Sequence, residues 1–132
     1  MADRPNILWI CTDQQRFDSL GCYGNEFVTT PNLDRLAGRG TLFEHTYSQS
    51  PVCTPSRAGF LTGRYPRTTR TRQNGQSMPA DETLITRVLA DAGYLCGLSG
   101  KLHLSASHPD IAPVAEPRLD DGYNIFHWSH HP

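Results

Sequence analysis

A cysteine and an arginine lie close together in the stretch SPVCTPSRAGFLTG, residues 50–63. Cys53 just precedes a segment that is typical of a helix start, and Arg57 falls within the first turn of that segment. The positive end of a helix stabilises a thiolate or another anion, and an arginine offers a fork of donors to sulfate or phosphate. The stretch predicts either a nucleophile that faces an anion or a structural cysteine beside a surface arginine.

A lysine and a histidine follow an apolar segment in SGKLHLS, residues 99–105. In an extended segment, residues two apart point the same way, so Lys101 and His103 would present a cation and an imidazole on one side. Such a pair can hold an oxyanion and protonate a leaving group. The alternative is a solvated lysine beside a core histidine.

Oxygen-bearing side chains occur at two further places. Asp13 and Gln14 directly follow the apolar run NILWICT, and two adjacent oxygen donors at a strand end suit a hard cation such as Ca²⁺ or Mg²⁺. Aspartate is also common in turns, so a turn-capping role stays open. Asn74 ends the run TRTRQN, for which an exposed basic loop is the ordinary interpretation.

Three histidines, His127, His130 and His131, lie in the last six residues. A zinc site would need more ligands at fixed geometry, and we favour a histidine-rich surface loop.

Regular elements that could position these residues alternate along the chain. Apolar runs predict buried strands, while proline near the first helical position and glycine after the last one predict helices. The expected order is strand 6–12, a helix that starts at Thr30 and ends at Gly38 or Gly40, strand 41–48, helix 55–63, loop 64–78, helix 81–93 capped by Asp81, and strand 94–100. This order favours an α/β fold with a mostly parallel sheet flanked by helices. Because the pattern dissolves after Lys101, the domain is expected to be incomplete.

Composition narrows the classes of function. The chain has 132 residues, enough for one domain, and a net charge of -1, which argues against a nucleic-acid or membrane surface. No leader or long apolar run is visible, so we expect a cytoplasmic protein. The four cysteines show no CxxC pair, and Cys11 and Cys96 are expected to be small buried residues.

Four segments together resemble a known family. PNILWICTDQ, TPNLDRLAGRG, SPVCTPSRAGFLTGRYP and AGYLCGLSGKLHL occur in the order and style of the type I sulfatases, which belong to the alkaline-phosphatase-like superfamily. The resemblance covers about residues 6–104, and its most specific part is C-x-P-S-R followed by A-G-F-L-T-G-R. Residues 1–132 therefore resemble the N-terminal part of a sulfatase-type catalytic domain.

The resemblance implies roles for particular residues. Cys53 resembles the cysteine that a separate maturation enzyme oxidises to formylglycine, whose hydrated aldehyde attacks the sulfur of a sulfate ester. Asp13, Gln14 and the Cys53 position resemble ligands of a divalent metal, Ca²⁺ in preference to Mg²⁺ or Mn²⁺. Arg57 resembles the arginine that holds the nucleophile, and Lys101 and His103 match the G-K-x-H pair that contacts sulfate and nucleophile.

Two departures from the family pattern keep alternatives open. Many members have Asp-Asp where this chain has Asp13-Gln14, and Asp-Gln is familiar from the branch that includes phosphonate monoester hydrolases. Asn74 resembles a substrate-contacting asparagine of that branch. Family members are several times longer, and their later metal ligands have no counterpart here. The leading hypothesis is hydrolysis of a small sulfate ester, with this chain inactive alone; the alternatives are a phosphonate or phosphate-ester hydrolase and a non-enzymatic truncated product.

Overall fold

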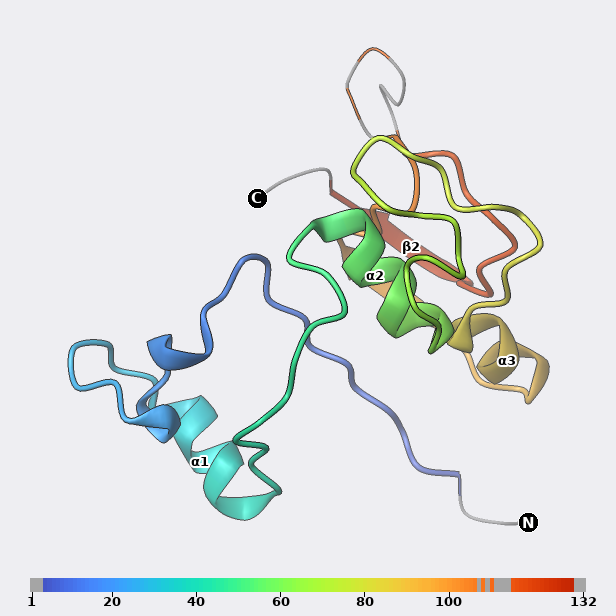
Figure 1. Cartoon of the computed structure of the whole chain (residues 1–132). Coiled ribbons are helices and arrows are strands. Elements are labelled where there is room, and N and C mark those ends of the chain that lie inside the picture. The colour runs from blue at the N-terminus through green and yellow to red at the C-terminus, as the bar shows by residue number, and fades with distance from the viewer. Residues whose placement is uncertain (1–3, 107, 109, 111–114, 130–132) are drawn as a thin grey trace. The chain divides into compact units, whose positions relative to one another are not determined.

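The computed structural model describes residues 4–106, 108, 110 and 115–129 (Figure 1). The chain divides into two compact units, Met1–Thr46 and Tyr47–Pro132, and each is described by itself. The described elements, in order, are the short 3-10 helices Phe17–Ser19 and Gly21–Tyr23, the α-helices α1 (Pro31–Arg39), α2 (Cys53–Thr62) and α3 (Ile85–Asp91), and the strands β1 (Gly97–Gly100) and β2 (Ile125–Trp128).

The first unit is organised around the start of α1. Pro31 occupies the first turn, as expected, because a helix needs no N–H donor there. Thr30 Oγ1 donates to Asp34 Oδ1 (2.9 Å) and accepts from the backbone N–H of Gly21 (2.8 Å), and Asp34 Oδ1 also accepts from the N–H of Cys22 (2.8 Å). These bonds tie the second 3-10 helix to the first turn of α1.

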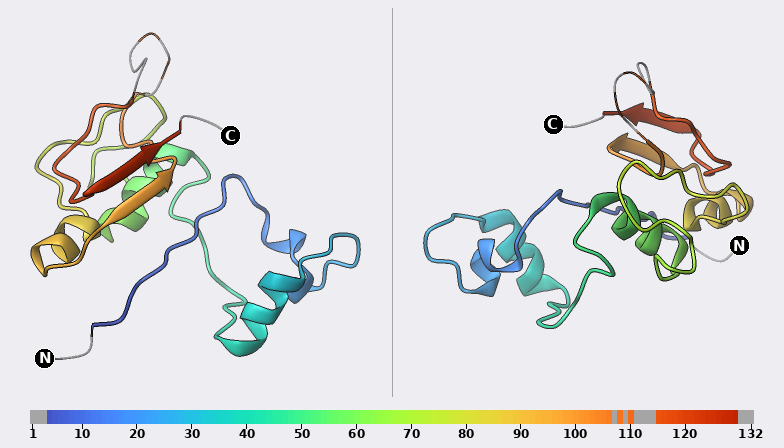
Figure 2. Two further views of the ribbon diagram at one scale, coloured as in Figure 1. Left: turned by 180° about the vertical axis from the view of Figure 1, so that it is seen from behind. Right: turned by 45° about the horizontal axis from the view of Figure 1, so that its top comes forward.

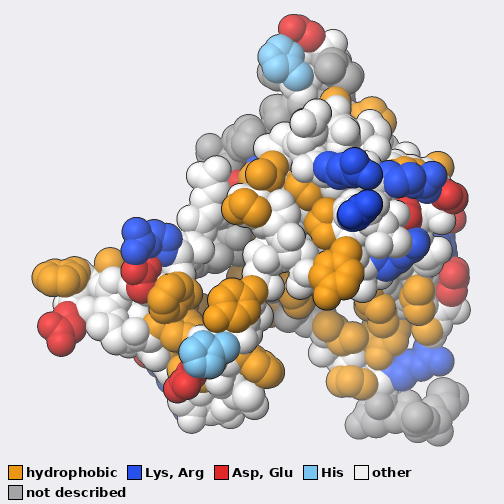
Figure 3. Space-filling model, in the orientation of Figure 1, with side chains coloured by type: hydrophobic (Ala, Val, Ile, Leu, Met, Phe, Trp, Pro, Cys, Tyr) orange, Lys and Arg blue, Asp and Glu red, His pale blue; other side chains and the backbone are white. Residues whose placement is uncertain are grey.

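The predictions of strands at 6–12 and 41–48 are wrong. Both segments lack regular structure, and the apolar side chains of the first segment are exposed, with Leu8 83% accessible. Cys11 is exposed as well, against the expectation that it is buried. A strand forms only when its backbone groups find a partner, and no described strand pairs with either segment. Figure 3 shows hydrophobic side chains at several places on the surface of the face that it draws. The exposed large hydrophobic residues of these two segments are Ile7, Leu8, Trp9, Ile10, Leu42, Phe43 and Tyr47.

The second unit holds the hydrophobic core. Its buried members come from α2, from the loop before α3 and from the segment after β1: Ala58, Leu61, Met78, Leu84, Leu102 and Leu104. Side chains from β1 and β2 pack against them, so α2 covers one face of the small sheet, as the opposite views in Figures 1 and 2 show. Each leucine or methionine side chain buried in this way contributes about 1.5–3 kcal/mol relative to exposure.

The sheet is parallel but small. Gly97 pairs with Ile125 and Gly100 with Trp128 in register. The expected strand 94–100 is confirmed over its last four residues, whereas β2 is an element that the sequence pattern did not predict. The predicted layering of helices on a parallel sheet is thus found for these two strands and α2.

Helix α3 is shorter than expected. It begins at Ile85 instead of at 81, and its N-cap position is Leu84, which is fully buried in the core. Asp81 does not cap it, because its carboxylate pairs with Arg70 (2.5 Å). The core contact of Leu84 therefore fixes the helix start more strongly than the capping preference of aspartate.

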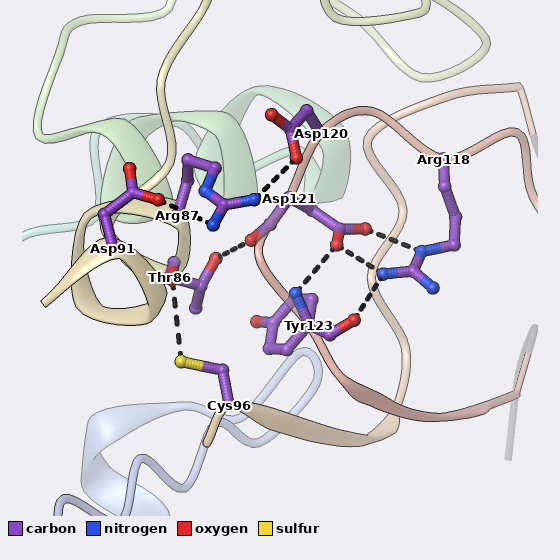
Figure 4. Close-up of polar contacts among 8 residues, drawn as sticks. All are labelled: Thr86, Arg87, Asp91, Cys96, Arg118, Asp120, Asp121 and Tyr123. Carbon is purple, nitrogen blue, oxygen red and sulfur yellow. Dashed lines mark hydrogen bonds and ion pairs between the residues drawn. The ribbon is translucent and has the colours of Figure 1, made fainter. Parts of the chain in front are cut away.

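A polar turn before β2 anchors that strand to α3 (Figure 4). The buried carboxylate of Asp121 pairs with Arg118 and accepts from the N–H of Tyr123 (2.9 Å), and its backbone carbonyl accepts from Thr86 Oγ1 (2.5 Å). The hydrogen bonds to Asp121 raise the pKa of Arg118, and burial is the main cause that raises the pKa of Tyr123 above its ordinary value. Gly122 has φ +78° and no room for a Cβ, which would lie 2.5 Å from the carbonyl of Thr86.

Candidate active site

Cys53 is the first residue of helix α2, and the helix begins two residues earlier than the sequence predicts. The residue before it, Val52, has extended backbone and its carbonyl accepts the first helical hydrogen bond, from the N–H of Ser56 (3.0 Å). The side chain of Cys53 is half-buried, so it is partly open to solvent at the end of the helix where free N–H groups collect. This placement fits a group that reacts with, or becomes, an anion.

The start of α2 has a cap that comes from another part of the chain. Asn74 lies in the loop 64–78, and its Oδ1 accepts from the backbone N–H of Thr54 (2.9 Å), the second residue of the helix. The residue preceding Cys53, Val52, makes no side-chain cap bond. Asn74 thus lies next to the nucleophile candidate, and its predicted substrate contact stays a prediction.

Replacing Asn74 with alanine is expected to lower the free energy of unfolding by about 1 kcal/mol, because the N–H of Thr54 loses its acceptor. Asn74→Asp keeps an acceptor oxygen at the same distance along the side chain and is the matched control. Chemical denaturation of both variants measures the difference. Equal stability of the two variants would show that the cap contributes nothing.

Arg57 joins α2 to the segment that follows β1. Its side chain is buried, 8% exposed, and its Nη1 donates to the backbone carbonyl of Lys101 (2.5 Å). The two motifs that the sequence singles out, CTPSR and GKLHL, are therefore in direct contact although these two residues lie 44 positions apart. Arg57 is not the surface arginine of the alternative interpretation.

The backbone at His103 is not extended. Its φ is +57°, in the left-handed region that non-glycine residues rarely adopt, and its side chain is buried with 6% exposure. Lys101 is only half-buried. The premise that Lys101 and His103 lie in one extended segment is therefore wrong, and how they act on a substrate stays a prediction. Strained residues of this kind persist where surrounding contacts enforce them, and they concentrate at functional sites.

Glu116 supplies such contacts, and it belongs to no motif that the sequence analysis singles out. Its buried carboxylate accepts from the N–H of His103 (2.6 Å to Oε2), from the N–H of Leu104 (2.8 Å to Oε1) and from Trp128 Nε1 (3.0 Å to Oε2). The residue lies in an irregular proline-containing segment with no periodicity, so no pattern pointed to it.

The predicted metal ligands are divided between the two units. Asp13 and Gln14 are exposed residues of the first unit, and Gln14 has φ +53°, again left-handed. A carboxylate and an amide carbonyl are hard oxygen donors, which fits Ca²⁺ or Mg²⁺. Within the described part of the chain, no group of three or more His, Cys, Asp and Glu side chains could by itself hold a metal ion.

The tail histidines are only partly covered by the structure. His127 is an exposed residue of β2, and His130 and His131 lie outside the described residues. No helix in the described ranges is both long enough and apolar enough to cross a membrane.

The family model for sulfatases matches residues 5–116, which include CTPSR, GKLHL and Glu116. The chain belongs to the sulfatase family. Human steryl-sulfatase is 38% identical over 96% of this chain and 24% of its own length. The predicted relation to the N-terminal part of the sulfatases is therefore confirmed. The chain spans about a quarter of the length of the relatives it matches.

Two solved structures show the fold to which this sulfatase chain is similar. One is the structure of BT4656 in complex with its substrate D-glucosamine-2-N,6-O-disulfate, which is 32% identical with a TM-score of 0.79, over 96% of this chain and 23% of that one. The other, the phosphonate monoester hydrolase of Agrobacterium radiobacter, is 31% identical with a TM-score of 0.75, over 95% of this chain and 25% of that one. The expected alkaline-phosphatase-like fold is confirmed in this coarse form, with two strands and three helices described here.

Proposed function

We propose that the complete gene product carrying this chain hydrolyses sulfate esters with a nucleophile derived from Cys53. The observation that supports the proposal is the hydrogen bond from Arg57 to the Lys101 carbonyl, which holds the cysteine helix against the G-K-x-H segment. Family membership supports the reaction class, because the match includes both motifs.

Four residues of the chain have separate roles in the proposed reaction. The half-buried Cys53 at the start of α2 provides the reacting position, and formylglycine made there by a maturation enzyme would supply a hydroxyl nucleophile. Arg57 holds the α2 start against the Lys101 segment. The Lys101 ammonium binds sulfate oxygens, and the His103 imidazole donates a proton to the departing oxygen of the ester.

Asp13 and Gln14 would each supply an oxygen ligand to a divalent metal ion, Ca²⁺ in preference to Mg²⁺ or Mn²⁺. The ion would supply positive charge that withdraws electrons from the ester. The oxygen donors of Asp13 and Gln14 fit a hard cation, and both side chains are exposed in the first unit.

A phosphonate monoester is the second candidate substrate. The similarity to a phosphonate monoester hydrolase favours it, as does glutamine at position 14. A direct comparison of a sulfate ester with a phosphonate monoester distinguishes the two candidates.

The deciding experiment measures kcat/KM of the complete gene product on an aryl sulfate and on the matching aryl phosphonate monoester. We expect the sulfate ester to be hydrolysed with the higher kcat/KM. The reverse preference would establish the second candidate, and no turnover of either ester in metal-loaded, matured protein would contradict both and favour a non-enzymatic role.

A further inference from the structure

Glu116 is a buried carboxylate, 2% exposed, that the proposed chemistry does not use. Three N–H groups donate to it: two consecutive backbone groups, of His103 and Leu104, and the indole of Trp128. An ionised carboxylate only accepts hydrogen bonds, so it matches three donors and no acceptor. Bonds to a charged acceptor are about twice as strong as neutral ones, and here they offset the cost of burying the charge.

These hydrogen bonds constrain the backbone of His103 in particular. Two successive N–H groups can point at one carboxylate only if the backbone turns sharply between them, and His103 does so with φ +57°. The same segment is held on its other sides, where Arg57 donates to the Lys101 carbonyl and the N–H of Met78 donates to the Leu104 carbonyl (2.7 Å). Glu116 therefore supplies the contact that compensates the unfavourable backbone conformation at His103.

We infer that Glu116 is a positioning residue for the reaction: its carboxylate fixes the left-handed backbone of His103 and so aims the imidazole at the ester. The inference rests on the proposed function, in which His103 donates the proton. Glu116 does not contact the substrate in this account; it acts through His103. The bond from Trp128 also connects the Glu116 carboxylate to the last residue of β2.

The test uses Glu116→Gln in the complete gene product. The amide group has nearly the same size, but it turns one acceptor oxygen into a donor, so it cannot accept from both His103 and Leu104. We expect kcat on the sulfate ester to fall by about 100-fold with KM little changed, because misplacing a catalytic group by about 1 Å costs rate without weakening substrate binding.

Two matched variants separate positioning from packing. Glu82→Gln makes the same change in another buried carboxylate of this unit, one that pairs with Arg64 (2.6 Å), and is expected to leave kcat close to wild type. Trp128→Phe removes the indole donor while both backbone donors stay, and is expected to reduce kcat far less than Glu116→Gln. A loss in either control as large as that of Glu116→Gln would overturn the inference.

A second readout does not depend on activity. In protein labelled with ¹⁵N-histidine, Glu116→Gln is expected to shift the imidazole signals of His103, and Glu82→Gln is expected to leave them unchanged. If wild-type protein fails to hydrolyse sulfate esters, the proposed function fails, and the histidine spectrum alone decides whether Glu116 positions His103. Unchanged His103 signals in Glu116→Gln would contradict the inference in either case.

Discussion

Replacing Cys53 with alanine is expected to lower kcat for sulfate-ester hydrolysis by the complete gene product by about four orders of magnitude or more. Removing the nucleophile of an enzyme typically costs this much, because what remains is binding and charge stabilisation alone. Alanine is a strong helix former, and Cys53 is a half-buried first residue of α2, so the helix is expected to persist. Steady-state kinetics with an aryl sulfate measures the loss.

The control for this variant is Cys22→Ala. Cys22 is also half-buried, and it lies in the second 3-10 helix of the first unit, outside every motif assigned to the reaction. We expect its kcat to match that of the wild type. Substantial turnover by Cys53→Ala, with metal bound and the fold intact by circular dichroism, would show that the nucleophile is another group.

Replacing Asp121 with alanine is expected to lower the free energy of unfolding by about 3 kcal/mol, because it leaves a charged partner and a backbone donor without their acceptor. Asp121 is 1% exposed, and its carboxylate holds the Arg118 guanidinium and the N–H of Tyr123 (Figure 4). Arg118 also lies 4.3 Å from the centre of the Phe126 ring, so losing its anchor disturbs β2 as well. Urea unfolding followed by fluorescence measures the change.

The neighbouring residue provides the control. Asp120 pairs with Arg87 (2.8 Å) at the surface, where its side chain is 82% exposed, and Arg87 keeps a second partner in Asp91 (2.6 Å). Asp120→Ala should therefore cost less than about 1 kcal/mol, as exposed ion pairs do. Equal losses of unfolding free energy in the two variants would mean that burial of the carboxylate does not determine how much each aspartate stabilises this turn.

Local signals in the sequence predict helices well in this chain. Pro31 in the first turn places the start of α1 within one residue, and of the two glycines expected to end the helix, Gly38 and Gly40, Gly40 is the one that follows its last residue. Gly63, with φ +67°, ends α2 as expected. These signals work because a proline or a glycine acts on the backbone where it stands, without help from distant residues.

Strands were predicted less well, because a strand depends on a partner elsewhere. The run 6–12 has the composition of a buried strand but pairs with no described strand, while Ile125–Trp128 has no strong pattern and forms β2 by pairing with β1. Likewise, the early start of α2 follows from the Asn74 cap, which lies 20 residues away from Thr54. Contacts over such separations leave no periodic trace in the sequence.

In the candidate site, too, local sequence signals predict some features, and contacts between distant residues determine the others. Residue types and motif order were enough to single out Cys53, Arg57, Lys101 and His103, and the structure places Arg57 against Lys101. The left-handed backbone of His103 and the role of Glu116 could not be foreseen, because they arise from two N–H groups that meet a carboxylate 12 and 13 residues further on. Local residue types predict a chemistry, whereas the positioning of these residues depends on contacts with distant parts of the chain.

The central claim is that Cys53 is the position where the nucleophile is made, and a mass spectrum of the peptide containing Cys53, isolated from the native host, tests it most directly. The account predicts that the thiol has been converted to an aldehyde or its hydrate. An unmodified thiol in cells with an active maturation enzyme would contradict the account and would make Cys53 a structural residue at the start of α2.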